Sequence, residues 1–290
     1  MNSEERKRRI RAARTFLFVP ADQPDRIAKA LKSESDAVII DLEDAVRSTN
    51  KVKARTGLEL PPRPVATPLI FLRVNAYGSP EFKQDVLKAL ELQVDGLILP
   101  KFVPGQSAIA ADQALTRLEV ASGTEVTLPA IGLVETTAGV LALLNSSGIP
   151  ARVERLAFGG ADLYTDLGIS FSAAGPNTDL AMAALVMASV HAQLGSPIDT
   201  PHFMLGDEIG LKARSEYAAA MGFGGKLCIH PNQLQIVSQS FAVKEDESEW
   251  AQRVIDLWNE RDQSSGALLL DSNLIDEAMV KRAKQILGLL

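Results

Sequence analysis

Short apolar runs alternate along the chain with longer segments that have helical periodicity. The runs are rich in Val, Ile, Leu and Phe, and they predict strands at residues 16–19, 37–41, 69–74, 96–99, 127–133, 155–158, 198–200 and 226–229. The segments between them predict helices at residues 25–32, 51–58, 81–92, 106–122, 137–146, 178–194 and 206–221. Buried strands that alternate with crossover helices are typical of a parallel sheet.

This alternation predicts an α/β fold, a closed (β/α)8 TIM barrel rather than an open doubly wound sheet. Proline interrupts the chain between elements, as at Pro20 after the first strand and Pro100 after the fourth. A chain of 290 residues suits this fold, because such barrels typically need about 250 residues.

The composition changes near residue 241, where an acidic stretch begins. A helix-like segment to Arg261, a polar turn at residues 262–266 and an amphipathic segment at residues 275–290 follow. This tail is too short for a hydrophobic core of its own. We therefore expect a catalytic barrel domain over residues 1–240 and a short C-terminal helical extension over residues 241–290, which packs on the barrel or on a neighbouring subunit.

The composition is that of an ordinary globular protein, with 46% hydrophobic and 23% charged residues. No apolar stretch approaches the roughly 20 residues that span a bilayer, so we expect no membrane association. The net charge of −6 gives no general attraction for nucleic acid. Any anionic ligand must therefore be held by a local group of basic side chains.

The N-terminal segment and the cysteine content favour a cytoplasmic protein. The first residues are basic but lack the apolar core of a signal peptide, and they predict a solvated helix or tail. The single cysteine, Cys228, lies in an apolar run and is expected to be buried. One cysteine cannot form an internal disulfide, which is consistent with a reducing compartment.

Two carboxylates stand where apolar strands open into turns of small residues. Glu135 ends the run Leu-Pro-Ala-Ile-Gly-Leu-Val-Glu, and Asp162 ends Leu-Ala-Phe-Gly-Gly-Ala-Asp. In a parallel barrel the carboxyl ends of all strands emerge on one face, so these acids could share one Mg²⁺ or Mn²⁺ ion, which prefers oxygen ligands. Each acid could instead be only a helix cap. Beside Asp162, Gly160 and Ala161 would leave backbone N–H groups open to a substrate anion.

The second and third predicted strands add charge to the same face. The second ends in the acidic cluster Asp41-Leu-Glu43-Asp44, and the third carries Arg73 near its end. Clustered carboxylates need compensation by cations, a metal or hydrogen-bond donors. Arg73 is therefore predicted either to neutralise this cluster or to hold a substrate carboxylate or enolate oxygen. Glu43 and Arg73 are our candidate catalytic residues here, and Lys101 after the fourth strand is a second cation.

The segments that contain these residues resemble a known family. They include Asp-Leu-Glu-Asp-Ala-Val46, Phe-Leu-Arg-Val-Asn75, Leu-Val-Glu-Thr-Thr-Ala-Gly139, Phe-Gly-Gly-Ala-Asp-Leu163 and Gly-Gly-Lys-Leu-Cys-Ile-His-Pro231. In this order they resemble the citrate lyase beta-subunit-like proteins of the HpcH/HpaI aldolase superfamily. The likeness runs from about Arg14 to the last predicted helix, which is nearly the whole chain.

The resemblance implies a (β/α)8 barrel that cleaves or forms a carbon–carbon bond between an acyl-CoA and a 2-oxo acid. It implies that Glu135 and Asp162 hold Mg²⁺ and that Arg73 steadies the thioester enolate. A malyl-, methylmalyl- or citramalyl-CoA lyase is the leading hypothesis. Such cleavage needs an ion to polarise the substrate oxygen, a base for its hydroxyl proton and a cation for the enolate, which these residue types can supply.

The resemblance also implies how the C-terminal extension takes part. Asp276 matches the family's proton donor and acceptor, which is supplied to a neighbouring active site in a homotrimer or homohexamer. CoA would lie near Arg26 and Lys29. The chain departs from the family pattern at Thr137, where arginine is common, and at Ser272. These differences leave the metal pair intact and leave open whether CoA or an acyl carrier protein carries the thioester.

Two other functions fit the same residues. A class II aldolase that acts on free 2-oxo acids would share the barrel and the metal pair, and turnover without CoA would identify it. A non-catalytic subunit, which binds a thioester or helps to assemble a citrate lyase complex, would bind its ligand without turning it over. The complete set of acids, including Asp276, favours an enzyme.

Overall fold

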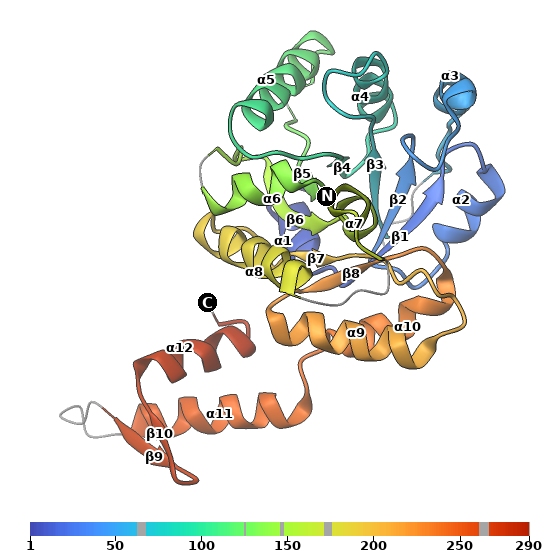
Figure 1. Ribbon diagram of the computed structural model, residues 1–290. Coiled ribbons are helices and arrows are strands. Elements are labelled where there is room, and N and C mark those ends of the chain that lie inside the picture. The colour runs from blue at the N-terminus through green and yellow to red at the C-terminus, as the bar shows by residue number, and fades with distance from the viewer. Residues whose placement is uncertain (63–67, 125, 146–147, 171–175, 261–266, 290) are drawn as a thin grey trace. The chain divides into compact units, whose positions relative to one another are not determined.

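Parallel strands close into a barrel in chain order, with β1 paired to both β2 and β8 (Figure 1). The computed structural model describes residues 1–62, 68–124, 126–145, 148–170, 176–260 and 267–289. The barrel strands are β1 Thr15–Pro20, β2 Ala37–Asp41, β3 Leu69–Arg73, β4 Gly96–Leu99, β5 Ala130–Val134, β6 Val153–Phe158, β7 Ile198–Asp199 and β8 Gly225–Cys228. The predicted (β/α)8 barrel is confirmed.

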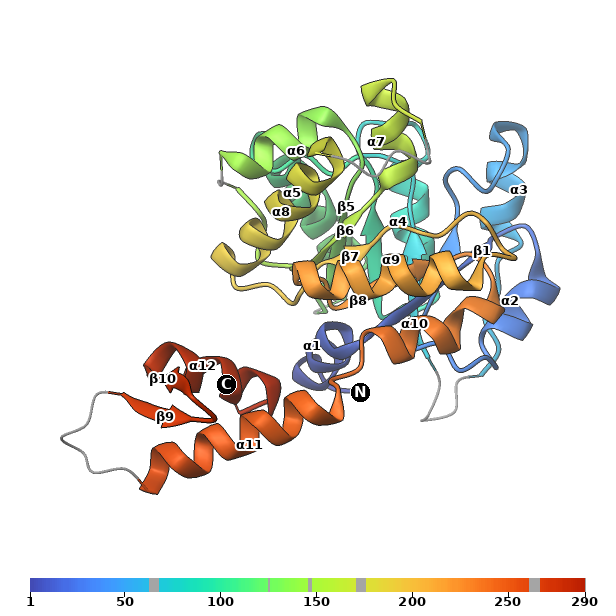
Figure 2. The ribbon, with the colours of Figure 1, turned by 60° about the horizontal axis from the view of Figure 1, so that its bottom comes forward.

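Most helices lie between successive strands and pack around the outside of the barrel, whereas α1 precedes β1 and α10 follows β8 (Figure 2). They are α1 Ser3–Ala12, α2 Pro24–Ala30, α3 Lys51–Thr56, α4 Phe82–Glu91, α5 Gln106–Ala121, α6 Thr137–Leu144, α7 Gly160–Leu167, α8 Pro176–His191, α9 Glu208–Met221 and α10 Leu234–Ser240, with the short 3₁₀ helices η1 Ser48–Asn50 and η2 Pro231–Gln233. The sequence did not predict α7, because its opening glycine has a low helix propensity. Of the helices in the described ranges, none is long and apolar enough to cross a bilayer.

Strand side chains alternate between two apolar layers, because successive residues of a strand face opposite sides of the sheet. Inward residues such as Phe16, Ile39 and Phe71 fill the barrel. Outward residues such as Leu17 and Ile40 pack beneath the helices. The barrel is therefore a packed core, and chemistry can begin only where the inward side chains become polar.

One strand begins later than the sequence predicts, and one predicted helix end lies outside the described residues. The strand predicted at 127–133 begins only at Ala130, because Pro129 has no N–H to donate to a neighbouring strand. Its carbonyl still accepts a hydrogen bond from Leu97. The predicted end of the helix at Ser146 lies outside the described residues.

The N-terminal helix α1 is anchored to the barrel rather than fully solvated, which corrects the sequence prediction. Ile10 is fully buried, and Arg11 bonds Glu154 at 2.8 Å. At the amino end of β6, Arg155 is completely buried and donates to the backbone carbonyls of Ile10 and Ala13. Burial lowers the pKa of Arg155 to about 9. The Arg155 side chain therefore joins α1 to the amino end of the barrel.

The chain divides into two compact units, Met1–Phe241 and Ala242–Leu290. The second contains α11 Glu245–Glu260, the antiparallel strands β9 Leu268–Leu270 and β10 Asn273–Ile275, and α12 Glu277–Ile286. Contrary to our expectation, it has a small apolar cluster of its own, formed by Ala251, Val254, Ile275, Val280 and Ala283. The polar turn predicted at residues 262–266 and the helix end predicted at Arg261 lie outside the described residues.

Candidate active site

A cavity of about 430 Å³ opens at the carboxyl ends of the barrel strands. Its lining includes five of the predicted site residues, Arg73, Glu135, Gly160, Ala161 and Asp162. The rest of its lining combines the polar residues Asp41, Asp44 and Thr200 with small and apolar ones, among them Phe18, Ala45, Leu133, Pro201, Phe203, Leu227 and Ile229. The structure therefore brings together the acids and the arginine that the sequence singled out.

Strand periodicity explains why these side chains meet. Asp41, Arg73 and Glu135 each stand two positions after a residue that fills the barrel interior, and side chains two positions apart point the same way. The interior residues concerned are Ile39, Phe71 and Leu133. The polar residues thus form the layer directly above the apolar core.

Arg73 is buried at the end of β3 and is held by neighbouring carboxylates. It donates to both oxygens of Asp41, at 2.8 and 2.6 Å. Another terminal nitrogen lies 3.2 Å from Glu43 and 3.7 Å from Asp44, and the guanidinium lies 5.0 Å from the centre of the Phe18 ring. Burial alone would lower the pKa of Arg73, but the carboxylates, Asp41 foremost, raise it above its usual value. Arg73 is a fixed, fully charged group.

Glu43 is buried between two cations. One carboxylate oxygen lies 3.2 Å from Arg73, and the other lies 3.6 Å from Nζ of Lys101. Within the described residues, Oε2 of Glu43 has no hydrogen-bond partner. Burial has the largest influence and raises the pKa of Glu43 to about 7, although Arg73 opposes it. Near neutral pH this residue is therefore present in both its protonated and its ionised form.

Glu135 follows β5 directly and is only 1% exposed. Its Oε1 accepts a hydrogen bond of 2.7 Å from the backbone N–H of Lys101. Gly159 makes room for it, since a Cβ there would lie 2.3 Å from Cβ and 2.8 Å from Oε2 of Glu135. Burial, followed by the charge of Glu43, raises the pKa of Glu135 to about 8.

Asp162 lies in the first turn of α7, exposed toward the same cavity. Its charge is close enough to contribute to the raised pKa of Glu135. The N-cap of α7 is Gly159 and that of α6 is Thr136. Glu135 precedes the N-cap of α6 and caps no helix, so the simpler interpretation is wrong for this residue. Asp162 is not the N-cap, but it stands in the first turn of α7, where an acid favours the helix.

The donor set fits a hard divalent cation that keeps part of its water. No cluster of three or more His, Cys, Asp or Glu side chains suited to a metal ion occurs in the described ranges. Mg²⁺, however, is commonly bound through one or two carboxylates together with water and substrate oxygens. The pKa of Glu135, raised to about 8, indicates that the protein's own donors do not balance its negative charge. Together Glu135 and Asp162 could therefore hold such an ion.

Four predicted site residues are not among the described residues that line this cavity. One of them, Glu43, is buried beside Arg73. Arg26 and Lys29 are exposed on α2. Asp276 belongs to the second unit, where it is the N-cap of α12 and accepts a hydrogen bond of 3.0 Å from the N–H of Met279. The roles of these residues in CoA binding and proton transfer stay predictions.

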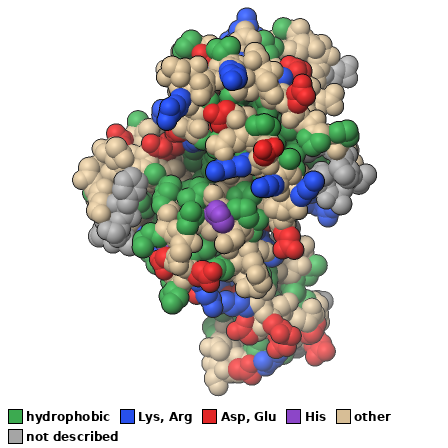
Figure 3. All heavy atoms as spheres, turned by 90° about the vertical axis from the view of Figure 1, so that its right-hand side faces the viewer, with side chains coloured by type: hydrophobic (Ala, Val, Ile, Leu, Met, Phe, Trp, Pro, Cys, Tyr) green, Lys and Arg blue, Asp and Glu red, His purple; other side chains and the backbone are tan. Residues whose placement is uncertain are grey.

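Positive charge is concentrated locally despite the net charge of −6. The face in Figure 3 shows Lys and Arg side chains gathered across its middle, beside an apolar area that surrounds a histidine. Such a group raises the local concentration of anionic ligands. The overall acidity of the protein is therefore compatible with an anionic substrate.

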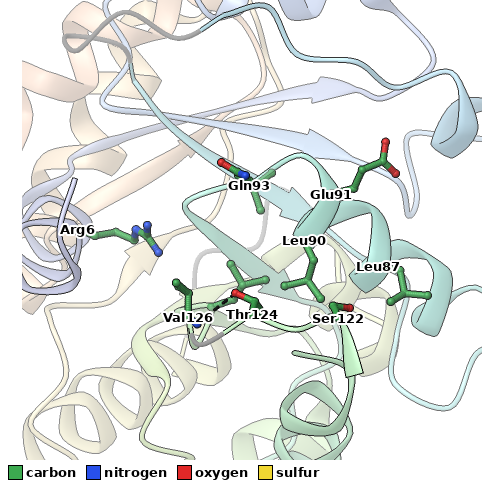
Figure 4. Close-up of a pocket in the computed structure, with 10 residues that line it drawn as sticks. Arg6, Leu87, Leu90, Glu91, Gln93, Ser122, Thr124 and Val126 are labelled. Atoms are coloured by element: carbon green, nitrogen blue, oxygen red, sulfur yellow. Dashed lines mark hydrogen bonds between the residues drawn. The ribbon is translucent and has the colours of Figure 1, made fainter. Parts of the chain in front are cut away.

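A larger cavity, of about 580 Å³, lies at the amino ends of β4 and β5, away from the paired carboxylates (Figure 4). Leu87, Leu90 and Val126 line it, and Arg6 points toward it from α1. Glu91 is the only carboxylate in its described lining. This cavity therefore lacks the paired acids found beside Arg73, despite its size.

Two residues outside the predicted set help to build the candidate active site. Thr200, directly after β7, accepts the N–H of Gly160 at 3.0 Å and so fixes the start of α7. This N–H is therefore not open to a substrate anion, which corrects the sequence prediction for Gly160. Asp41, which the sequence indicates only as a member of an acidic cluster, is the residue that holds Arg73. Both follow an inward apolar residue by two positions, so strand periodicity was the signal that could have identified them.

Comparison with known proteins supports one family. The HpcH/HpaI aldolase/citrate lyase model matches residues 14–231. A citrate lyase subunit beta-like protein from Deinococcus radiodurans is 31% identical over 95% of this chain and 96% of its own. A (3S)-malyl-CoA thioesterase from Cereibacter sphaeroides is 30% identical over 95% and 93%. An L-malyl-CoA/beta-methylmalyl-CoA lyase from Rhodobacter capsulatus is 24% identical over 95% and 94%.

A solved structure matches nearly the full length of the chain. The protein CitE from Mycobacterium tuberculosis, in complex with magnesium, acetoacetate and coenzyme A, has a TM-score of 0.76 to this structure at 26% identity. The match covers 96% of this chain and 98% of that one. These matches confirm the resemblance that the sequence motifs predicted. The chain belongs to the HpcH/HpaI aldolase/citrate lyase family.

Proposed function

We propose that this protein is a Mg²⁺-dependent carbon–carbon lyase. Its substrate would be a 3-hydroxyacyl-CoA such as malyl-, methylmalyl- or citramalyl-CoA, which it cleaves to, or forms from, an acyl-CoA and a 2-oxo acid. The observation that carries the proposal is a single cavity lined by Glu135, Asp162 and Arg73. Mg²⁺ or Mn²⁺ held by the two carboxylates would polarise the oxygen that becomes the 2-oxo group. The magnesium and coenzyme A bound by CitE support this choice.

The protein's own side chains balance the charge that moves during cleavage. The hydroxyl proton leaves, the C–O group becomes a carbonyl, and the electron pair of the broken carbon–carbon bond enters the thioester as an enolate. Arg73 offsets the enolate charge, since Asp41 fixes its guanidinium before the reaction begins. Glu43, whose pKa burial raises to about 7, holds or releases a proton beside Arg73.

We assign the proton transfers to Asp276 of an adjacent protomer in a homotrimer or homohexamer. This exposed carboxylate at the start of α12 would take the hydroxyl proton and return a proton to the enolate carbon. Gly160 and Ala161, at the start of α7, would contact the 2-oxo acid. Arg26 and Lys29 would attract the phosphates of CoA.

Thioester hydrolysis is a second candidate, because the (3S)-malyl-CoA thioesterase is 30% identical to this chain, compared with 24% for the L-malyl-CoA/beta-methylmalyl-CoA lyase. The two reactions differ in the bond that breaks. Cleavage of malyl-CoA by a lyase yields acetyl-CoA and glyoxylate, whereas hydrolysis yields malate and a free CoA thiol.

Mass spectrometry of the products formed with Mg²⁺ and each of the three thioesters tests the proposal. We expect an acyl-CoA and a 2-oxo acid, no activity in EDTA, and a loss of about 10²–10³-fold in kcat for Glu135→Gln, which removes a charged ligand. Glu34→Gln changes an exposed glutamate and serves as the matched control. Full activity of Glu135→Gln would exclude this metal-dependent mechanism. Turnover of pyruvate and an aldehyde without CoA would instead identify a class II aldolase.

A further inference from the structure

Lys101 has a backbone conformation that is unfavourable for residues with a side chain. It lies two residues after β4, and its φ angle is 50°, in the left-handed region. A Cβ crowds the following carbonyl in this region, so glycine is the residue that adopts it without strain. Strained residues of this kind persist where surrounding contacts hold them, often at functional sites.

The strained conformation directs the chain onto β5. The N–H of Lys101 donates to Oε1 of Glu135 at 2.7 Å, and the N–H of the next residue, Phe102, donates to the carbonyl of Leu133 at 2.9 Å. The Phe102 ring packs where a side chain at Gly132 would stand, since a Cβ there would lie 2.7 Å from the ring. The loop after β4 is thus fastened to β5 along the residues that lead to Glu135.

The same contact leaves the other oxygen of Glu135 available. Oε1 is engaged by Lys101, whereas Oε2 faces Gly159, where the missing side chain leaves space. The ammonium group of Lys101 lies 3.6 Å from Glu43, so the side chain does not compete for Glu135. A free rotation of the Glu135 carboxylate would weaken any ion held there, because a ligand must be positioned before it binds.

We propose that Lys101 is a positioning residue for the metal site: its left-handed backbone conformation holds Oε1 of Glu135 and presents Oε2 to the cation. This inference rests on the proposed function, since the cation is the one assigned to Glu135 and Asp162. The proposed role depends on the backbone conformation of Lys101 and not on the charge of its side chain. Substitutions that all remove the ammonium but differ in backbone preference can therefore separate the two.

Lys101→Gly and Lys101→Val both remove the ammonium but have opposite backbone preferences. Glycine adopts a positive φ freely, whereas β-branched valine resists it. We expect Lys101→Val to bind Mn²⁺ about tenfold more weakly than Lys101→Gly, which corresponds to the strain of one unfavourable residue. Lys101→Arg, which keeps the charge and an unbranched Cβ, should bind within about threefold of the wild type.

The experiment is a titration of each full-length variant with Mn²⁺ alone, in which electron paramagnetic resonance measures the free ion. Calorimetry of the same samples confirms that each variant is folded. If Lys101→Val does not fold, Lys101→Ala replaces it, with an expected loss of about fivefold relative to Lys101→Gly. If Lys101→Gly and the folded valine or alanine variant bound Mn²⁺ with equal affinity, the proposed role of Lys101 would be overturned, but the metal site would stand. A wild type that binds no Mn²⁺, or binds it as well as Glu135→Gln does, would overturn the metal site itself and this inference with it.

Discussion

Burial determines the charge state of the two glutamates in the candidate active site. It raises the pKa of Glu135 to about 8 and that of Glu43 to about 7, from an ordinary value of 4.5. Between the ordinary and the raised values, the folded protein holds protons that the unfolded chain releases. The contribution of these groups to the free energy of unfolding therefore falls as the pH rises through this window. A bound cation would offset the loss by balancing the ionised carboxylates.

We expect Mg²⁺ to stabilise the protein more at about pH 8 than at about pH 6. Glu135 must lose its proton to bind a cation, so affinity should rise by up to about tenfold per pH unit below its pKa of about 8 and then level off. Calorimetry with and without Mg²⁺ measures the shift in Tm at each pH. Glu135→Gln has no proton to lose and should show little shift at either pH. Equal Tm shifts of the wild type at both pH values would contradict a titrating ligand.

At the scale of elements, the junction of β6 and α7 sets the shape of the site. Gly159 and Gly160 bring the backbone so close that a side chain would collide with its neighbours. A Cβ on Gly159 would lie 2.3 Å from Cβ of Glu135, and one on Gly160 would lie 2.8 Å from Oγ1 of Thr200. The junction therefore determines how closely the helix that carries Asp162 approaches Glu135.

Gly159→Ala should displace Glu135 and weaken Mn²⁺ binding by at least about tenfold, because overpacking of this kind typically costs about 1–3 kcal/mol. A fall in kcat should accompany it. Gly206→Ala is the matched control, since a Cβ there would meet nothing within 4 Å. Titration with Mn²⁺ and steady-state kinetics compare the two variants. Unchanged affinity in folded Gly159→Ala would show that Glu135 does not need this space.

The strands could be predicted from the sequence because each strand of a parallel barrel is buried on both faces and appears as a short apolar run. Most helices followed from their periodicity, but α7 and the short α10 were missed. Two glycines at the start of α7 conceal it. The hairpin of β9 and β10 was also missed. Its turn places Asp271 and Ser272 at positive φ, where glycine or asparagine would have been the recognisable signal.

The candidate site was predictable to the extent that strand ends determine it. Glu135, Arg73 and Asp162 were identified because acids and bases at the ends of parallel strands must converge. The contacts of Thr200 and of the Lys101 backbone could not be predicted, because they join loops that are distant in sequence. No local pattern of residue types reports such hydrogen bonds.

At the scale of the whole molecule, the chain carries its predicted chemistry on two separate units. Glu135 and Asp162 lie in the barrel unit, Met1–Phe241, and Asp276 lies in the unit Ala242–Leu290. Each unit has an apolar cluster of its own. A second unit that delivers one carboxylate could serve the barrel of another protomer, as the family resemblance implies.

Mixing two inactive variants tests whether the active site is shared. Glu135→Gln and Asp276→Asn should each have little activity alone, because one lacks the proposed metal ligand and the other the proposed proton carrier. If each site combines the barrel of one protomer with Asp276 of the next, random assembly of equal amounts should restore about a quarter of the sites. Coexpression followed by kinetics measures the recovery, and native mass spectrometry measures the composition of the assemblies.

Glu135→Gln mixed with Asp162→Asn, two changes within the same barrel, should recover no activity. A mixture no more active than its separate components would mean that Asp276 does not act across protomers.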